Sequence, residues 1–163
     1  MNILLISPTS GGIGGIAQHV DGLSQFLTGL DHEVDIISSA NTLTIPIKRL
    51  KNPSFVFSSF LKTKFKKGND IVHAHHIAGA LAMKNVSCKK ILSIHGIYSK
   101  NIAQLYGKTT SNMSKKYEKV ALNLADGITV VSKEGYNYYT EMGFNVAQIP
   151  NACLLYTSDA ADE

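Results

Sequence analysis

The sequence predicts an α/β fold in which a parallel sheet is flanked by helices. Three observations support this prediction: short segments that are apolar throughout, helical segments that alternate with them, and a glycine-rich loop after the first apolar run. Strands of a parallel sheet are buried on both faces, and they need a long crossover, usually a helix, between them. With 163 residues, the chain is long enough to bury the core of one such domain.

Each expected strand is short, rich in β-branched residues and bounded by Gly, Asp, Ser or His. The first, Ile3–Ile6, is a continuous apolar run closed by Ser7 and Pro8. The remaining strands are expected at Glu33–Ser38, Asp70–Ala74, Lys90–Ile94 and Gly127–Val131, and a sixth at Ala147–Asn151.

Helices are expected between these strands. In Ile16–Leu30, apolar residues recur at the spacing of one helical face. Further helices are expected near Phe55–Lys66, Ile77–Met83, Met113–Leu124 and Lys133–Met142. The region Thr42–Lys67 fits the alternation least well, so we expect it to contain an excursion from the regular fold.

The composition is that of an ordinary globular protein, with 44% hydrophobic and 17% charged residues. No apolar run reaches the length of a membrane span. Met1–Ile6 has no positive leader before its apolar run, and it therefore reads as a strand and not as a signal peptide. The two cysteines, Cys88 and Cys153, are too few for a disulfide framework, so we expect a cytoplasmic protein.

The end of the chain does not fit the fold. Residues 153–163 carry three acidic residues and no basic one, and they show no periodicity. They resemble the translated adapter sequence found at the ends of truncated gene models. We therefore expect a domain over residues 1–152 followed by a non-native tail over residues 153–163.

The loop between the first strand and the first helix contains four glycines among the five residues Gly11–Gly15. Glycine allows a tight turn and lets bare backbone approach a ligand closely. The free N–H groups and positive dipole end of the following helix point into the same space, which favours phosphate. A loop that serves only tight packing is the simpler alternative.

Two kinds of phosphate site remain open from the residues alone. Gly12, Gly14 and Ala17 have the spacing of a dinucleotide-binding fingerprint, and Asp35 lies at about the distance of its ribose-binding acid. However, Asp35 falls inside the second strand and not at its end. A Walker-type loop is excluded, because no Gly-Lys-Ser/Thr follows.

An ordered set of motifs resembles the retaining glycosyltransferases built from two Rossmann-like domains (the group 1, family 4-like type). Gly14-Gly15-Ile16-Ala17-Gln18-His19 is similar to the Gly-Gly-x-x-x-His signature that opens this family. The resemblance continues through Asp31–Val34 (where the family usually has Gly at the position of Asp31), Asp70–His75, Ser93–Gly96, Ala125–Ser132 and Ile149–Asn151. No single motif is decisive, but the ordered set covers nearly all of residues 1–152.

The resemblance implies a Rossmann-like N-terminal domain on the acceptor side of a hexosyltransferase-type enzyme. Its donor would be a nucleotide-sugar and its acceptor a saccharide or a lipid-linked sugar, with no metal or other cofactor. A second domain, which supplies most donor contacts in the family, would begin soon after Asn151, so this chain would not be active alone. An NAD(P)-dependent oxidoreductase domain and a non-catalytic binding fragment are the alternatives.

The resemblance also suggests roles for individual residues. Gly14 and Gly15 would lie against the donor diphosphate, and His95 would lie by the transferred sugar as the candidate catalytic residue. His19, His75 and Ser132 would shape the acceptor or sugar cleft; no protein nucleophile is implied.

The positions of the histidines can also be interpreted without the resemblance. His75 and His95 each follow an expected strand at its cleft end, whereas His73 lies within its strand and is expected to be structural. Zinc binding by the segment His73–His76 is not expected, because no Cys or carboxylate nearby completes a ligand set.

The stretch Lys48–Lys67 holds seven basic residues and no acidic one, interleaved with phenylalanines. Phe57, Phe60, Leu61 and Phe65 fall on one face of a helix, with Lys62, Lys64, Lys66 and Lys67 as candidate membrane-facing residues. Such a helix can lie at an anionic membrane surface, or it can pack its phenylalanines on the sheet. We do not expect nucleic-acid binding, because no recognised module accompanies the charge. The protein would then be peripheral at the inner membrane face.

Overall fold

The computed structural model describes residues 1–45, 47, 50–106 and 108–151. The tail expected to be non-native, residues 153–163, lies outside the described residues, as do Lys48 and Arg49 of the basic stretch.

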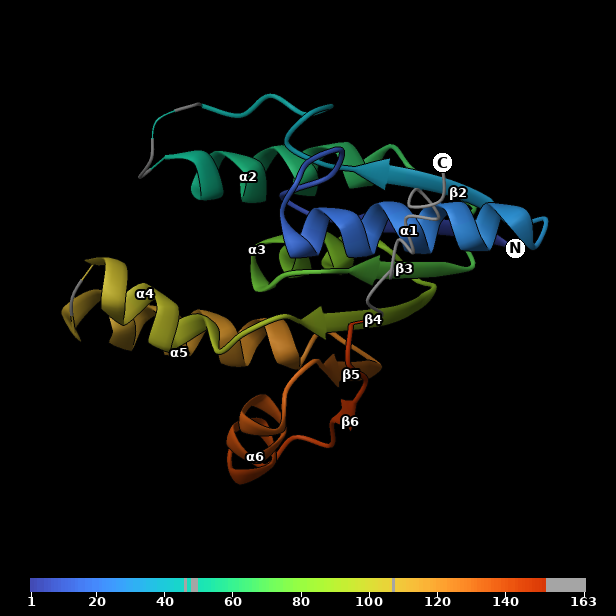
Figure 1. The fold of residues 1–163 in the computed structure, drawn as a ribbon. Helices are drawn as coiled ribbons and strands as arrows, with labels where there is room; N and C mark the ends of the chain where they lie inside the picture. Colours follow the sequence, from blue (N-terminus) through green and yellow to red (C-terminus); the bar gives the residue numbers. More distant parts are fainter. Residues whose placement is uncertain (46, 48–49, 107, 152–163) are drawn as a thin grey trace, which may run out of the picture.

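The described residues form a six-stranded parallel sheet in the order β2-β1-β3-β4-β5-β6 (Figure 1). This confirms the predicted α/β fold with a Rossmann-like parallel sheet flanked by helices. The strands are β1 (Asn2–Ile6), β2 (Glu33–Ile37), β3 (Ile71–Ala74), β4 (Lys89–Ile94), β5 (Gly127–Val130) and β6 (Ala147–Gln148).

Helices lie on both faces of this sheet. They are α1 (Gly15–Gly29), α2 (Lys51–Lys64), α3 (Ile77–Ala80), the 3₁₀ helix η1 (Leu81–Asn85), α4 (Tyr98–Tyr106), α5 (Lys108–Leu122) and α6 (Lys133–Glu141). None of the helices in the described part of the chain is long and apolar enough to cross a membrane.

The core is divided by the sheet into two unequal parts. Successive residues of β1 point to opposite faces, so that Ile3 and Leu5 pack with Val20 of α1 on one face. Leu4 and Ile6 join the larger cluster on the other face, which includes Phe55 of α2 and residues of α3, α5 and α6. Both sets are almost fully buried, which explains why β1 reads as an unbroken apolar run.

The order of the strands fixes where a ligand can bind. From β1 the chain crosses to β2 at one edge, and it then returns past β1 to β3 and continues towards β6. The strand order therefore reverses at β1 and β3. In open parallel sheets, ligands bind outside the carboxyl ends of the strands at such a switch point.

Some elements differ from the sequence prediction. The expected excursion corresponds to the segment after β2, in which the described residues up to Ile45 form neither strand nor helix, and α2 begins at Lys51 and not at Phe55. Pro53 is tolerated there because it lies in the first helical turn, where its missing N–H has no intrahelical acceptor. Helix α4 was not predicted from the sequence. It packs mainly against α5, and local periodicity does not reveal such a contact between helices.

Candidate functional site

The glycine-rich loop is held to the helix that follows it. Gly11 adopts a positive φ of 66°, which favours glycine, and its backbone N–H donates to Asp21 Oδ2 of α1 at 2.8 Å. Gly14 is the extended N-cap residue of α1, and its carbonyl accepts from the backbone N–H of Gln18 at 3.0 Å. The loop is therefore ordered by contacts within its own β1–α1 unit.

The start of α1 presents bare backbone. No side chain caps the helix, and its first turn holds no acidic residue. A Cβ added at Gly14 or Gly15 would meet no atom within 4 Å, and both residues are exposed. The free N–H groups of the first turn and the positive end of the helix dipole therefore face open space, as an anion site requires.

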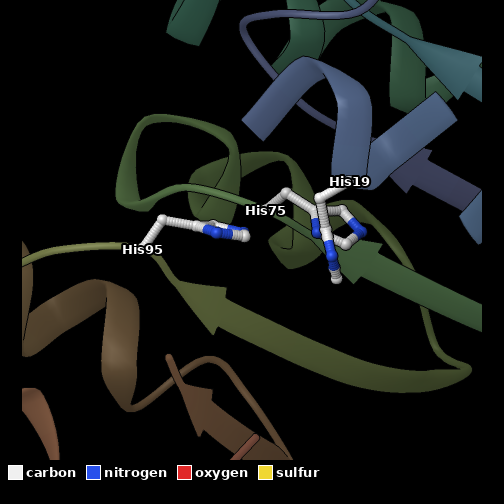
Figure 2. Close-up of side chains that lie close together, drawn as sticks. All are labelled: His19, His75 and His95. Carbon is white, nitrogen blue, oxygen red and sulfur yellow. The ribbon is translucent and has the colours of Figure 1, made fainter. Parts of the chain in front are cut away.

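Three histidines from separate segments meet beside this loop. His19 lies one turn into α1, while His75 and His95 directly follow β3 and β4, and Figure 2 shows the three rings turned towards one another. Their ring centroids are 5.4 Å apart for His19 and His75, 5.2 Å for His19 and His95, and 5.9 Å for His75 and His95. The backbone N–H of His75 donates to the Ile6 carbonyl at 2.8 Å, which fixes His75 beside the end of β1.

The imidazoles of this cluster are neutral at physiological pH. Burial lowers the pKa of His19 below its ordinary value. Burial, together with the neighbouring histidines, lowers the pKa of His75 to about 2. Burial lowers the pKa of His95 to about 4, helped by His19 and His76 and opposed by the Asn151 side chain. Neutral imidazole can both donate and accept a hydrogen bond, so the cluster suits hydroxyl groups.

One of these rings has unsatisfied nitrogens. His75 is fully buried, and neither of its ring nitrogens has a hydrogen-bond partner among the described residues. His95 differs, because a hydrogen bond with the Asn151 side chain acts on its ring. A buried polar atom without a partner costs roughly 1–3 kcal/mol. Such a cost persists where the unsatisfied groups serve a ligand.

A chain of hydrogen bonds within the sheet lies next to the cluster. His73 Nε2 lies 2.7 Å from Ser93 Oγ, and Ser93 Oγ lies 2.6 Å from Thr129 Oγ1, so that the chain crosses β3, β4 and β5. The rings of His73 and His75 are 4.0 Å apart. The sequence predicted a structural role for His73 but not its hydrogen-bond partners. A signal for them was present: His73 and His75, like Ser93 and His95, are two residues apart, and this spacing places all four on one face of the sheet.

Ser132 and His76 have local partners. Ser132 Oγ accepts from the backbone N–H of Gly135 at 3.1 Å and caps α6 at the carboxyl end of β5. His76 Nδ1 accepts from the backbone N–H of Ala78 at 3.1 Å at the start of α3. Of the residues expected to line the sugar cleft, the structure thus brings His19, His75 and His95 together, while Ser132 stabilises a helix start.

Asp35 is placed poorly for a dinucleotide ribose. It lies in the middle of β2, opposite Leu4 in the register with β1, and its carboxylate pairs with Lys66 at 2.6 Å. The carboxyl end of β2 continues instead into Ser38. No feature of this strand favours the oxidoreductase alternative.

The predicted membrane-facing lysines divide into two pairs. Lys66 binds Asp35, and Lys62 Nζ donates to the Asn41 carbonyl at 2.7 Å, so both are held against the domain. Lys64 and Lys67 are exposed.

Comparison with known proteins identifies the family of the chain through one match. Comparison with curated protein sequences gives no match. The family model described as Glycosyltransferase Family 4 matches residues 13–153, which span the end of the glycine loop, all three clustered histidines and the end of the described sheet. The chain therefore belongs to glycosyltransferase family 4.

Proposed function

We propose that this domain supplies the acceptor-side cleft of an enzyme that transfers a sugar from a nucleotide-sugar donor to a saccharide or lipid-linked acceptor. The observation that carries the proposal is the convergence of an uncapped helix start with three neutral histidines at the switch point of the sheet. A nucleotide-sugar needs both features: an anion site for its diphosphate, and hydrogen-bonding groups for its hydroxyls.

In this proposal, Gly14 and Gly15 lie against the donor diphosphate. Because the histidines are neutral, the negative charge is met by backbone N–H groups and the dipole of α1 and not by imidazolium.

His95 is the proposed catalytic residue, because it follows β4 at the carboxyl end of the sheet and lies beside His19 and His75. It would orient the transferred sugar or the attacking hydroxyl by hydrogen bonding. His19 and His75 would shape the space for the acceptor. In an assay of sugar transfer by the full-length enzyme, His95→Ala is expected to reduce turnover strongly, and near-normal transfer would contradict the assignment.

Titration calorimetry on the full-length enzyme tests donor recognition. We expect heat of binding with members of a panel of nucleotide-sugars and none with NAD or NADP. Binding of a nicotinamide dinucleotide in place of nucleotide-sugars would support the oxidoreductase alternative, and binding of neither class would contradict the proposal.

The exposed face of α2 favours a second function, docking to a membrane. Phe57, Leu61 and Phe65 form a stripe at helical spacing, and Phe57 and Phe65 are 64% and 83% exposed. The helix instead buries Phe55, Ser59 and Thr63 against the domain. The stripe is thus not used for packing on the sheet, and its neighbours in the sequence, Lys64 and Lys67, are also exposed.

We propose that this stripe enters the interface of an anionic membrane and brings the cleft to a lipid-linked acceptor at the inner membrane face. Aromatic side chains would enter the headgroup region, while each lysine near the surface adds about 1 kcal/mol of attraction. Lys62 and Lys66 would have no part in this contact, since both are engaged within the chain.

Co-sedimentation with vesicles tests the membrane proposal. Phe57→Ser with Phe65→Ser, and separately Lys64→Glu with Lys67→Glu, should each reduce binding to anionic vesicles by more than about tenfold. Lys115→Glu with Lys116→Glu, a matched double charge reversal on the exposed surface of α5, should leave binding unchanged. Binding that is indifferent to lipid charge and salt would contradict the proposal.

A further inference from the structure

A carboxyl group of α5 is fully buried near the start of α4. It belongs to Glu118, which has no exposed surface, although Lys116 and Lys119 on either side of it are exposed. Ser114, Glu118 and Leu122 are four residues apart, so they share the buried face of α5. A run of charged residues in the sequence thus contains an acid that lies inside the domain.

Two hydrogen-bond donors meet at one oxygen of this carboxyl group. The backbone N–H of Tyr98 donates to Glu118 Oε1 at 3.1 Å, and the Tyr139 hydroxyl of α6 donates to the same oxygen at 2.6 Å. Tyr98 is the first residue of α4, and the first N–H groups of a helix have no acceptor within their own helix. Glu118 therefore caps the start of α4 from a neighbouring helix, where the helix dipole also favours an acid.

Stabilisation of the fold does not fully account for burying this acid. Oε2 of Glu118 has no hydrogen-bond partner, and no lysine, arginine or histidine pairs with the carboxyl group, among the residues that the structure describes. Taking an acid out of water without a cation or a full set of hydrogen bonds is costly. Such exceptions to polar satisfaction are expected where a residue serves function.

The two residues after Tyr98 are also tied to α6. Ser99 is buried, and its Oγ lies 2.9 Å from the Tyr138 hydroxyl. Lys100 Nζ pairs with Glu134 at 2.8 Å, but both side chains are exposed, so this pair contributes little. The buried bonds at Tyr98 and Ser99 are therefore the ones that hold the first turn of α4.

This first turn lies next to His95 in the chain. His95 follows β4 directly, and only Gly96 and Ile97 separate it from Tyr98. Ile97 is itself buried. The connection is thus held by the sheet at one end and by Glu118, through Tyr98, at the other.

We propose that Glu118 is a positioning residue for sugar transfer: it fixes the first turn of α4 and thereby the backbone that carries His95. This role rests on the proposed function of the domain. Because Glu118 is fully buried where α4, α5 and α6 meet, it acts on the reaction only through the connection that it holds.

The test is the steady-state kinetics of sugar transfer by the full-length enzyme, with the donor varied at saturating acceptor. Glu118→Met fills a similar space but leaves the Tyr98 N–H and the Tyr139 hydroxyl without their acceptor. It should lower kcat by about 10- to 100-fold, the effect of moving a reacting group by about 1 Å. The KM for the nucleotide-sugar should change by less than about twofold, because the diphosphate is bound at the glycine loop.

Two milder variants separate positioning from folding. Glu118→Gln keeps an oxygen that can accept both hydrogen bonds, so its kcat should stay within about threefold of the wild type. Tyr139→Phe removes one donor and should lower kcat by about 2- to 10-fold, with the donor KM unchanged. Circular dichroism shows whether each variant is folded. If Glu118→Met does not fold, Tyr139→Phe decides the outcome.

Glu141→Met is the matched control, because it makes the same substitution at an exposed position of α6. It should leave kcat and KM unchanged. The proposal is overturned by wild-type kcat in folded Glu118→Met or Tyr139→Phe, by Glu118→Gln as slow as Glu118→Met, by a loss that appears only in the donor KM, or by an equal loss in Glu141→Met. Absence of transfer by the wild-type enzyme would instead contradict the proposed function.

Discussion

Gly15→Ala separates the binding role of the glycine loop from its role in folding. Gly15 is the first residue of α1, its φ is not positive, and an added Cβ would meet no atom within 4 Å. The methyl group therefore does not strain the fold. Because alanine is the better helix former by about 0.5–1 kcal/mol, the melting temperature should stay level or rise by up to about 4 °C.

The same methyl group would stand over the backbone N–H groups that are proposed to bind the donor diphosphate. A hydrogen bond to a charged group contributes about 1.5–3 kcal/mol, so losing one such bond weakens binding by about 10- to 150-fold. Calorimetric titration with a nucleotide-sugar measures this change in Kd.

Gly29→Ala provides the matched control, because Gly29 ends the same helix and an added Cβ there is equally free of contacts. It should leave the Kd unchanged. The reasoning is refuted if folded Gly15→Ala binds the nucleotide-sugar as the wild type does, or if Gly29→Ala loses as much affinity.

Three further predictions concern the stability of the fold around the cleft. At Gly79 an added Cβ would lie 3.0 Å from Ile6 Cγ2 and 3.3 Å from the Ile6 carbonyl oxygen. Gly79→Ala should therefore lower the free energy of unfolding by about 1–3 kcal/mol, measured by urea denaturation. An unchanged urea midpoint would contradict this close packing. Ser132→Ala removes the side-chain acceptor for the Gly135 N–H and should cost about 0.5–2 kcal/mol in the same assay; no loss would show that the cap is dispensable. The folded-state pKa of His73 and His95 is lowered to about 4, so the unfolded chain binds more protons between pH 4 and 6.5. Stability should therefore be fully present above pH 6.5 and fall as the pH drops towards 4, and a urea midpoint that is flat over this range would contradict the burial of neutral histidines.

Much of the fold could be predicted because its signals are local. The unbroken apolar run of β1, the helical spacing in α1 and the glycines between them each follow from a few adjacent residues. The strand ends placed His75 and His95 at one edge of the sheet, since parallel strands share a carboxyl edge. These parts of the structure confirm the prediction.

The remaining features depend on packing between distant segments. His19 approaches His75 only because α1 packs on the face of the sheet formed by β1 and β3. No local sequence pattern specifies that position. The bonds from His73 through Ser93 to Thr129 need β3, β4 and β5 side by side in one register. Helix α4 likewise depends on its contact with α5.

Hydrogen–deuterium exchange on the full-length enzyme, with and without a nucleotide-sugar, tests the central claim most directly. A site at the switch point predicts that, within this domain, protection is confined to peptides covering Gly11–His19 and the segments around His75 and His95, and that NAD produces none. Protection elsewhere on the domain, or the same protection with NAD, would contradict the account.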